Sequence, residues 1–316
     1  MKKLLSLLLA AAMVVALAAC GSSAPAPTAA PTEAPAATPV EVVDAEPVEA
    51  PVEVSDAAPD YASMSLEELK PLISTVTGGK LTVATSPDFA PYEFYAVVDG
   101  TPKLAGFDMA LAAYLAEGLG LELEVIPMDF DGTIAELTNG NVDLGMAGYS
   151  PKPERAEVMD FSDVYITGGQ SFVCLNANAD KFPDLAATNN PDFSIGAQVG
   201  SIQVDLAHEN SPDADIIEVT KVTDIIARLL AGKLDGAYIE TMVAESYAKN
   251  YPELNIILEV PYDAPGSVVG INKGNAPLVA AVNLLIAECK SSGTFDQYVF
   301  EANELAGGEI IEGLIE

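Results

Sequence analysis

The stretch over residues 128–165, MDFDGTIAELTNGNVDLGMAGYSPKPERAEVMDFSDVY, constrains this chain most strongly. Its apolar spacing and turn residues predict three elements in order, a short helix, a buried strand and a polar turn (132–139, 142–147 and 148–155). The turn holds a single guanidinium, Arg155, whose planar fork of donors matches a carboxylate. Ser150 offers a hydroxyl to the same oxygens, and Phe130, expected at the end of the preceding strand, offers an aromatic wall. The stretch therefore predicts a cleft that grips a small carboxylic acid.

Arg155 also has a simpler interpretation. It would be an exposed residue at the start of a short helix after Pro153, with Glu154 and Glu157 as its ion-pair partners. The local pattern leaves both interpretations open.

Four segments resemble a known family: TSPDFAPYEF, GFDMALAAYLAEGLG, PMDFDG and PERAEVMDFSDVY (85–94, 106–120, 127–132 and 153–165). They look like the family-3 extracellular solute-binding proteins, the polar-amino-acid receptors of bacterial ABC importers. The resemblance runs from about Gly79 to about Glu301 and is closest to the glutamine- and histidine-type branches. It implies an α/β protein with the two-lobe periplasmic-binding-protein type II fold. In that fold each lobe is a mostly parallel sheet flanked by helices, and the chain makes two hinge crossings.

The alternation of strands and helices along the chain, among them strands at 80–85 and 194–198 and a helix at 222–230, independently predicts parallel sheet layers. We place the domain boundaries on this pattern. Lobe one comprises residues 63–164 and 269–316, lobe two comprises residues 170–263, and the hinge comprises residues 165–169 and 264–268. Because the chain leaves lobe one and returns to it, that lobe is discontinuous in sequence.

The first residues are typical of a lipoprotein signal peptide (1–19). Two lysines precede an apolar core that is too short for a membrane span, and Leu17-Ala18-Ala19-Cys20 resembles a lipobox. Lipidation of Cys20 would anchor the protein to the membrane on its extracytoplasmic side. The alternatives are an uncleaved anchor and an ordinary secretory signal.

Residues 20–62 predict a disordered tether after the lipidated cysteine. From Gly21 to Asp60 the chain contains Ala, Pro, Thr, Val and acids but no Lys, Arg or aromatic residue, so it lacks the side chains that form a core. Ser65 and Glu68 then have the spacing of a capping box that starts a short helix.

The formal net charge of −33 excludes a nucleic-acid partner and a stable footprint on anionic lipid. Cys174 and Cys289 are expected to be buried free thiols, since a disulfide would have to join elements placed in different lobes. The sequence has no CxxC pair or Cys/His cluster, so we expect no metal and no cofactor.

Further candidate ligand contacts in lobe one follow its strands. Ser86 and Phe89 come after the predicted strand Lys80–Thr85, and ligands of open α/β sheets collect at the carboxyl ends of strands. Phe89 could equally be a core aromatic. Ala147 and the Gly148 backbone, at the end of the next predicted strand, complete the set.

In lobe two the candidates are Gln198, Ser201, Ile202 and Glu240. Ser201 and Ile202 open a predicted helix, whose N-terminal N–H groups suit a carboxylate, although Ser201 could simply cap that helix. The resemblance implies that Glu240 stands where the family has an aspartate that takes the ligand's α-ammonium. A helix-capping Glu240 is the alternative.

Taken together, these features predict the extracytoplasmic substrate-binding component of an ABC importer, a monomer that passes a free amino acid to permease subunits. Within the resemblance, Ser86 replaces an acid and Gln198 replaces a lysine, which favours a neutral polar ligand. One rival is a dehydratase-like enzyme on the same fold, but we assign no catalytic residue, because nothing around the single histidine, His208, forms a catalytic arrangement. The other rival is a partner-signalling sensor protein.

Overall fold

The computed structural model describes residues 59–264 and 266–308. The predicted signal peptide, Cys20 and most of the predicted tether therefore lie outside the described residues. Tyr61–Ser63, at the end of that predicted tether, forms a 3₁₀ helix, and Tyr61 packs against the hydrophobic core. Ser65 caps α1 (Leu66–Leu69), and the predicted capping box with Glu68 is present.

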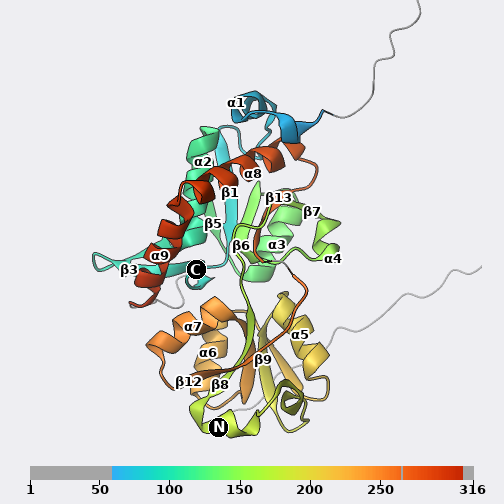
Figure 1. Ribbon diagram of the computed structural model, residues 1–316, viewed down its shortest axis with the longest axis vertical. Helices are drawn as coiled ribbons and strands as arrows, with labels where there is room; N and C mark the ends of the chain where they lie inside the picture. Colours follow the sequence, from blue (N-terminus) through green and yellow to red (C-terminus); the bar gives the residue numbers. More distant parts are fainter. Residues whose placement is uncertain (1–58, 265, 309–316) are drawn as a thin grey trace, which may run out of the picture. The chain divides into compact units, whose positions relative to one another are not determined.

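The first five-stranded sheet has the order β5-β1-β6-β13-β7 (Figure 1). Its strands are β1 (Lys80–Thr85), β5 (Glu122–Pro127), β6 (Leu144–Tyr149), β7 (Met159–Phe161) and β13 (Val268–Asn272). Its helices are α2 (Phe107–Leu119), α3 (Phe130–Thr138), α4 (Pro153–Ala156), α8 (Ala276–Ser291) and α9 (Thr294–Ala306). Because α2 and α3 both contact β1, that strand is buried from Leu81 to its end. We call this part, with α1, the first lobe.

The second five-stranded sheet has the order β10-β9-β11-β8-β12 and forms the second lobe. Its strands are β8 (Gln170–Leu175), β9 (Ser194–Gln198), β10 (Asp215–Val219), β11 (Gly236–Glu240) and β12 (Leu254–Glu259). Its helices are α5 (Ile202–Asn210), α6 (Val222–Leu230) and α7 (Thr241–Asn250). Two short 3₁₀ helices, at Asn176–Lys181 and Leu185–Thr188, follow β8.

The chain crosses between the lobes twice, once between β7 and β8 and once between β12 and β13 (Figure 1). The two crossing segments pair with each other, since Ser267 N–H donates to Ile166 O at 2.8 Å. The strands that flank the crossings run antiparallel to their neighbours, whereas β1 with β5 and β6, and β9 with β10 and β11, are parallel. The two-lobe α/β fold with two crossings, predicted from the sequence, is confirmed.

A small antiparallel sheet of the first lobe was not predicted. It consists of β2 (Asp88–Phe89), β3 (Glu93–Val98) and β4 (Thr101–Ala105). Asp99 and Gly100 both have positive φ at the β3–β4 turn, as a two-residue hairpin of the Asp-Gly type requires. That dipeptide is the sequence signal from which the hairpin can be recognised.

Several element boundaries match the prediction and others do not. The strands Lys80–Thr85 and Ser194–Gln198 and the helix Val222–Leu230 have the predicted ends. The helix predicted to start at residue 132 begins at Phe130, so Phe130 opens a helix and does not end a strand. The following strand begins two residues later than predicted, because Gly140 adopts positive φ and residues 139–143 form the connecting turn.

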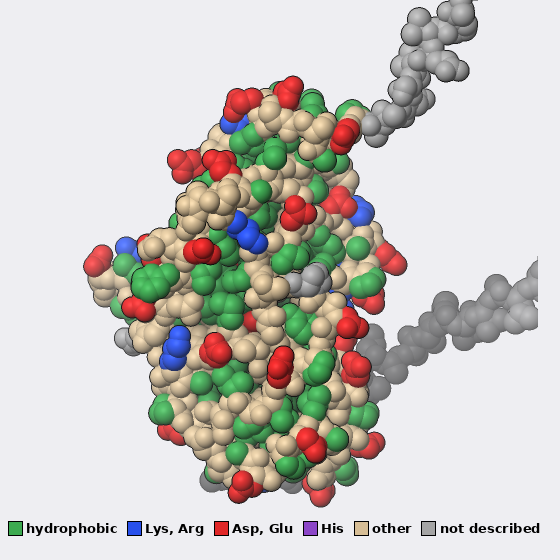
Figure 2. All heavy atoms as spheres, in the orientation of Figure 1, with side chains coloured by type: hydrophobic (Ala, Val, Ile, Leu, Met, Phe, Trp, Pro, Cys, Tyr) green, Lys and Arg blue, Asp and Glu red, His purple; other side chains and the backbone are tan. Residues whose placement is uncertain are grey.

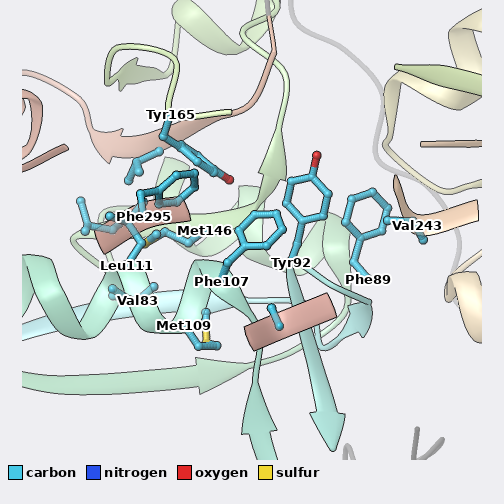
Figure 3. Close-up of a cluster of buried hydrophobic side chains, with 14 of the residues drawn as sticks. Val83, Phe89, Tyr92, Phe107, Met109, Leu111, Met146, Tyr165, Val243 and Phe295 are labelled. Atoms are coloured by element: carbon cyan, nitrogen blue, oxygen red, sulfur yellow. The ribbon is translucent and has the colours of Figure 1, made fainter. Parts of the chain in front are cut away.

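Aromatic side chains form much of the core around α2 and α9 (Figure 3). The ring of Phe107 lies 4.4 Å from that of Tyr92 and 5.9 Å from that of Phe295, centroid to centroid. Figure 3 shows the Phe89 ring between Tyr92 and Val243, a residue of α7, so the core continues from the first lobe into the second. Cys174 in β8 and Cys289 in α8 are buried and free, as predicted.

Acidic side chains are spread over the face seen in Figure 2, with few basic ones between them, in keeping with the strongly negative charge of the chain. Within residues 59–264 and 266–308, no helix combines the length and the apolar composition that a membrane crossing requires.

Candidate functional site

A cavity lies between the lobes. Ten of the eleven predicted ligand contacts line it: Phe89, Phe130, Ala147, Gly148, Ser150, Arg155, Gln198, Ser201, Ile202 and Glu240. Ser86 is the exception. Six further residues line the cavity and were not predicted: Tyr92, Gly168, Gln170, Gln203, Tyr262 and Ser267.

Arg155 lies in α4 with only 7 % of its surface exposed, so the interpretation as an exposed helix-start residue is wrong. Its guanidinium donates to Ser150 O at 3.1 Å and, across the lobes, to Gly200 O at 2.9 Å. The guanidinium carbon lies 5.5 Å from the centroid of the Phe130 ring. Burial lowers the pKa of Arg155, but a guanidinium still carries its charge at neutral pH. A fixed positive charge therefore faces the cavity from the first lobe.

Two aromatic rings wall the cavity on the side of the first lobe. Phe89 is 8 % exposed and Phe130 is 7 % exposed. Phe89 packs so closely on Gly148 that a Cβ at that glycine would meet its ring at 2.8 Å. Phe89 is thus part of the core and of the cavity wall, and the two interpretations of it are compatible.

The backbone of Gly148 forms a hydrogen bond with Asp108, a residue that does not line the cavity. Its N–H donates to Asp108 Oδ2 at 3.3 Å, and its φ of +60° favours glycine. Because the N–H already has this partner, the prediction that the Gly148 backbone donates to a carboxylate is revised.

Ser201 is the N-cap residue of α5, which was the alternative to direct ligand contact. Its hydroxyl donates to Gln198 O at 2.7 Å and accepts from Gln203 N, and its own N–H also donates to Gln198 O. The N–H of Ile202, the first residue of the helix, has no acceptor within the helix. Of the two amides predicted to bind a carboxylate, only that of Ile202 keeps this role.

Glu240 is 5 % exposed and stands at the junction of β11 and α7. One carboxylate oxygen, Oε2, accepts from Val243 N at 2.9 Å and caps α7, so the capping interpretation holds. The other, Oε1, is buried and has no hydrogen-bond donor within the described part of the chain. Burial raises the pKa of Glu240 to about 7, and backbone N–H groups, Val243 first, oppose the shift. The second lobe thus contributes a carboxyl group that requires a cationic partner to stay ionised.

Ser86 lies behind the cavity. Its hydroxyl donates to Asp88 Oδ1 at 2.7 Å, and Gln198 Nε2 donates to Asp88 Oδ2 at 3.0 Å. Both side chains that were predicted to define the ligand's side-chain pocket therefore bind the same buried acid. No sequence pattern identified Asp88, because the two-residue strand that carries it was not predicted.

Gln170, Gln203 and Tyr262 form a polar wall on the second lobe. Gln203 Nε2 donates to Gln170 Oε1 at 2.7 Å, and the Tyr262 hydroxyl donates to Gly168 O at 2.9 Å. Gln170 begins β8 and Tyr262 lies in the second crossing, both next to segments that the sequence did place at the hinge. Proximity to the predicted crossings was therefore the sequence feature from which Gln170 and Tyr262 could have been identified.

The site combines two opposite charges on the two lobes. The Arg155 guanidinium of the first lobe and the Glu240 carboxyl of the second line one cavity, together with Phe89 and Phe130. A small molecule that carries an anionic group and a cationic group matches this arrangement. Residues 59–264 and 266–308 contain no cluster of His, Cys, Asp or Glu that could hold a metal ion.

Comparison with known proteins agrees with this geometry. Residues 81–300 match the model of the bacterial extracellular solute-binding proteins, family 3. The chain is 31% identical over 223 residues to the arginine-binding extracellular protein ArtP of Bacillus subtilis, a match that covers 69% of this chain and 84% of ArtP.

A solved structure and an enzyme are also similar. The amino acid ABC transporter substrate-binding protein AbpA of Streptococcus pneumoniae, bound to L-arginine, superposes with a TM-score of 0.70 at 31% identity. That match covers 77% of this chain and all (100%) of AbpA. The cyclohexadienyl dehydratase of Pseudomonas aeruginosa is 27% identical over 176 residues, which span 56% of this chain and 65% of the enzyme.

Proposed function

Because the chain belongs to the bacterial extracellular solute-binding proteins of family 3, we propose that it captures a free amino acid between its lobes and delivers it to the permease subunits of an ABC importer. The observation that carries the proposal is the pair of buried opposite charges, Arg155 and Glu240, on opposite sides of one cavity. Every free amino acid has a carboxylate and an ammonium. Relatives that are named as amino-acid-binding proteins support the same class of ligand.

In this proposal the ligand carboxylate binds the Arg155 fork, the Ser150 hydroxyl and the Ile202 N–H. The ammonium binds Glu240 Oε1, with the Gly148 carbonyl as a second acceptor. Charge-assisted hydrogen bonds contribute about 1.5–3 kcal/mol each. A handful of them, less the cost of ordering, is consistent with a Kd near or below about 1 μM, or about −8 kcal/mol. The ligand contacts both lobes, so its binding favours the arrangement in which the lobes meet.

For the ligand side chain we propose a neutral polar group. Among the residues that line the cavity, Glu240 is the one carboxylate, and the α-ammonium uses it. The nearby acid Asp88 is already occupied, because Ser86, Gln198 and Val222 N–H donate to its two oxygens. A ligand with a second positive charge would lack a free carboxylate, whereas Gln170, Gln198 and Gln203 offer amide donors and acceptors.

Arginine is the second candidate ligand, and the specific observation in its favour is the naming of the relatives. ArtP is named as arginine-binding, and AbpA was solved with L-arginine. Binding of arginine here would require Asp88 to exchange one of its present donors for the guanidinium. That exchange is a testable difference between the two candidates.

We propose a binding protein and not an enzyme, although a dehydratase is among its relatives. His208 is exposed on α5, away from the cavity. The acids that line or adjoin the cavity have structural partners, since Glu240 caps α7 and Asp88 accepts three donors. Release of product from a prephenate-like acid on incubation with the protein would overturn this part of the proposal.

We also propose that the protein acts outside the cytoplasm as a lipoprotein. The family is extracellular, and Cys20 in the lipobox-like segment would carry the lipid. The predicted tether (20–62) would separate the anchor from lobe one and lobe two. Cys20→Ser should abolish incorporation of a clickable palmitate and release the protein from membranes. Unchanged labelling of that variant would exclude Cys20 as the lipidation site.

A thermal-shift screen of the purified protein against each of the common amino acids tests the proposed function. A ligand at 100 times its Kd stabilises the folded protein by about 2.7 kcal/mol, which moves the transition visibly. We expect glutamine or another neutral polar amino acid to produce the largest shift. A shift with arginine alone would replace the side-chain assignment and keep amino-acid capture, whereas no shift with any amino acid would overturn the proposal.

A further inference from the structure

We propose that Asp88 is a positioning residue for lobe closure: carried by the first lobe, its carboxylate caps helix α6 of the second lobe. The inference rests on the proposed function in one respect, because it takes closure to accompany ligand capture. It concerns contacts that lie behind the cavity and would not touch the ligand.

The N-terminus of α6 lacks a cap of its own. The residue at its N-cap position, Lys221, makes no side-chain capping bond. The first N–H groups of a helix have no acceptor within the helix and need one from elsewhere. Asp88 Oδ2 supplies it, accepting from Val222 N at 2.6 Å. A carboxylate at this end also interacts favourably with the helix dipole.

Two more contacts tie Asp88 to the second lobe. Gln198 Nε2 donates to the same Oδ2 at 3.0 Å, and the Tyr247 hydroxyl of α7 donates to the Asp88 backbone oxygen at 3.1 Å. The other carboxylate oxygen, Oδ1, has its donor in the first lobe, since it accepts from the Ser86 hydroxyl at 2.7 Å. Asp88 is 4 % exposed, so water does not replace these partners while the lobes meet.

The position of Asp88 couples these contacts to the cavity. The next residue, Phe89, forms a wall of the cavity, and Gln198 lines it from the opposite lobe. When the lobes separate, Val222 N–H and the Tyr247 hydroxyl lose Asp88 as an acceptor. Gln198 Nε2 loses it as well but keeps its bond to Thr220 O at 3.2 Å. The closed arrangement therefore gains three hydrogen bonds that do not depend on the identity of the ligand. Their loss should mainly accelerate ligand release.

The chain contains a matched control for this residue. Asp143 is also a buried aspartate, 1 % exposed, with three donors. They are Val76 N at 2.7 Å, Thr82 N at 2.8 Å and Thr82 Oγ1 at 2.6 Å, all within the first lobe. Removing either carboxylate disrupts a buried network, but only the loss of Asp88 breaks contacts between the lobes.

The test compares Asp88→Ala, Asp88→Asn and Asp143→Ala in the full-length protein. Affinity and release rate are measured with L-glutamine and L-arginine, and exchange of the Val222 amide is followed with and without saturating ligand, because the cap requires the lobes to meet. We expect Asp88→Ala to raise Kd at least tenfold, mostly through a faster release rate, and to accelerate exchange at Val222. Asp88→Asn should stay within threefold of wild type, because the amide oxygen can accept from Val222 and Gln198 while its nitrogen donates to Ser86. Asp143→Ala should lower the unfolding temperature and leave Kd within threefold.

Two outcomes overturn the inference. One is an unchanged Val222 exchange rate in Asp88→Ala, and the other is an effect of that variant on Kd no larger than that of Asp143→Ala. If the wild-type protein binds neither amino acid, the proposed ligand class is in question. The exchange rate at Val222, measured with the ligand that the thermal-shift screen identifies, then decides the inference.

Discussion

Replacing Arg155 by alanine is the sharpest perturbation that the structure offers. Of the five N–H groups of its guanidinium, the bonds to Ser150 O and Gly200 O occupy two. The remaining donors are available to a ligand carboxylate, and the stacking of the guanidinium near Phe130 fixes their direction. The variant removes the whole fork and one contact between the lobes.

The magnitude follows from the number of bonds. A bidentate contact with a carboxylate consists of two charge-assisted hydrogen bonds, each worth about 1.5–3 kcal/mol. Their loss corresponds to about 3–6 kcal/mol, or a rise in Kd of roughly 10²- to 10⁴-fold. Arg155→Lys keeps the charge but loses the fork, so we expect it to lie between wild type and alanine.

Isothermal titration calorimetry with the amino acid found in the thermal-shift screen measures these changes. Arg228→Ala serves as the matched control, because Arg228 is an exposed arginine of α6 that does not line the cavity. Thermal unfolding of each variant shows whether the fold is retained. If Arg155→Ala unfolds cooperatively and binds within threefold of wild type, the assignment of Arg155 to the ligand carboxylate is refuted.

Three further predictions concern the acids of the site. Glu240→Gln should weaken amino-acid binding about 10- to 100-fold in calorimetry, because a neutral amide replaces the partner of the ammonium. The same variant should have a higher unfolding temperature without ligand, because a buried charge is removed. Gly168→Ala places a Cβ 2.5 Å from Glu240 Oε1 and should weaken binding at least tenfold, whereas Gly78→Ala, with nothing within 4 Å, should leave calorimetric affinity unchanged. The ligand-free protein should become more stable to heat as pH falls from about 8 to about 5. Burial raises the pKa of Asp88 and Asp108 to about 6 and that of Glu240 to about 7, above the values of 3.8, 3.8 and 4.5 for exposed groups. The stability that these groups contribute is thus fully present below about pH 4 and is lost as pH rises through 6 to 7, by on the order of 3 kcal/mol for Asp88 alone. A decrease in the unfolding temperature as pH is lowered from 8 to 5 would contradict this prediction.

The sequence predicted the fold and most of the cavity because four segments resemble a known family and the strands and helices have regular apolar patterns. Lys80–Thr85 and Val222–Leu230 have the periodicity of a buried strand and an amphipathic helix, and both elements have the predicted ends. Arg155 could be proposed because its planar guanidinium matches a carboxylate and its segment resembles the family, although the local pattern alone left an exposed arginine possible. Parallel strands then place their carboxyl ends at one edge, which brings residues distant in sequence to the same cleft.

What the sequence could not predict depends on the direction of individual groups. Ser86 and Gln198 lie near the predicted place, but both donate to Asp88, a residue of an unpredicted two-residue strand. Gly148 does line the cavity, yet its N–H points away from it to Asp108. No periodicity records which of two backbone atoms faces a ligand, since that choice depends on contacts made by distant residues.

Asp108 shows how such distant contacts shape the site. Its Oδ2 accepts from Gly148 N at 3.3 Å and from the Tyr165 hydroxyl at 3.0 Å, so one buried oxygen holds both the cavity wall and the first crossing between the lobes. Glu93 is fully buried, and its pKa is raised well above its ordinary value by burial and by the charge of Asp108 beside it. Burial and the neighbouring acid therefore both disfavour a charge on Glu93. Because Asp108 Oδ2 accepts from Gly148 N, that N–H is not free for a ligand carboxylate. The polarity of the cavity is thus set partly by acids that do not line it.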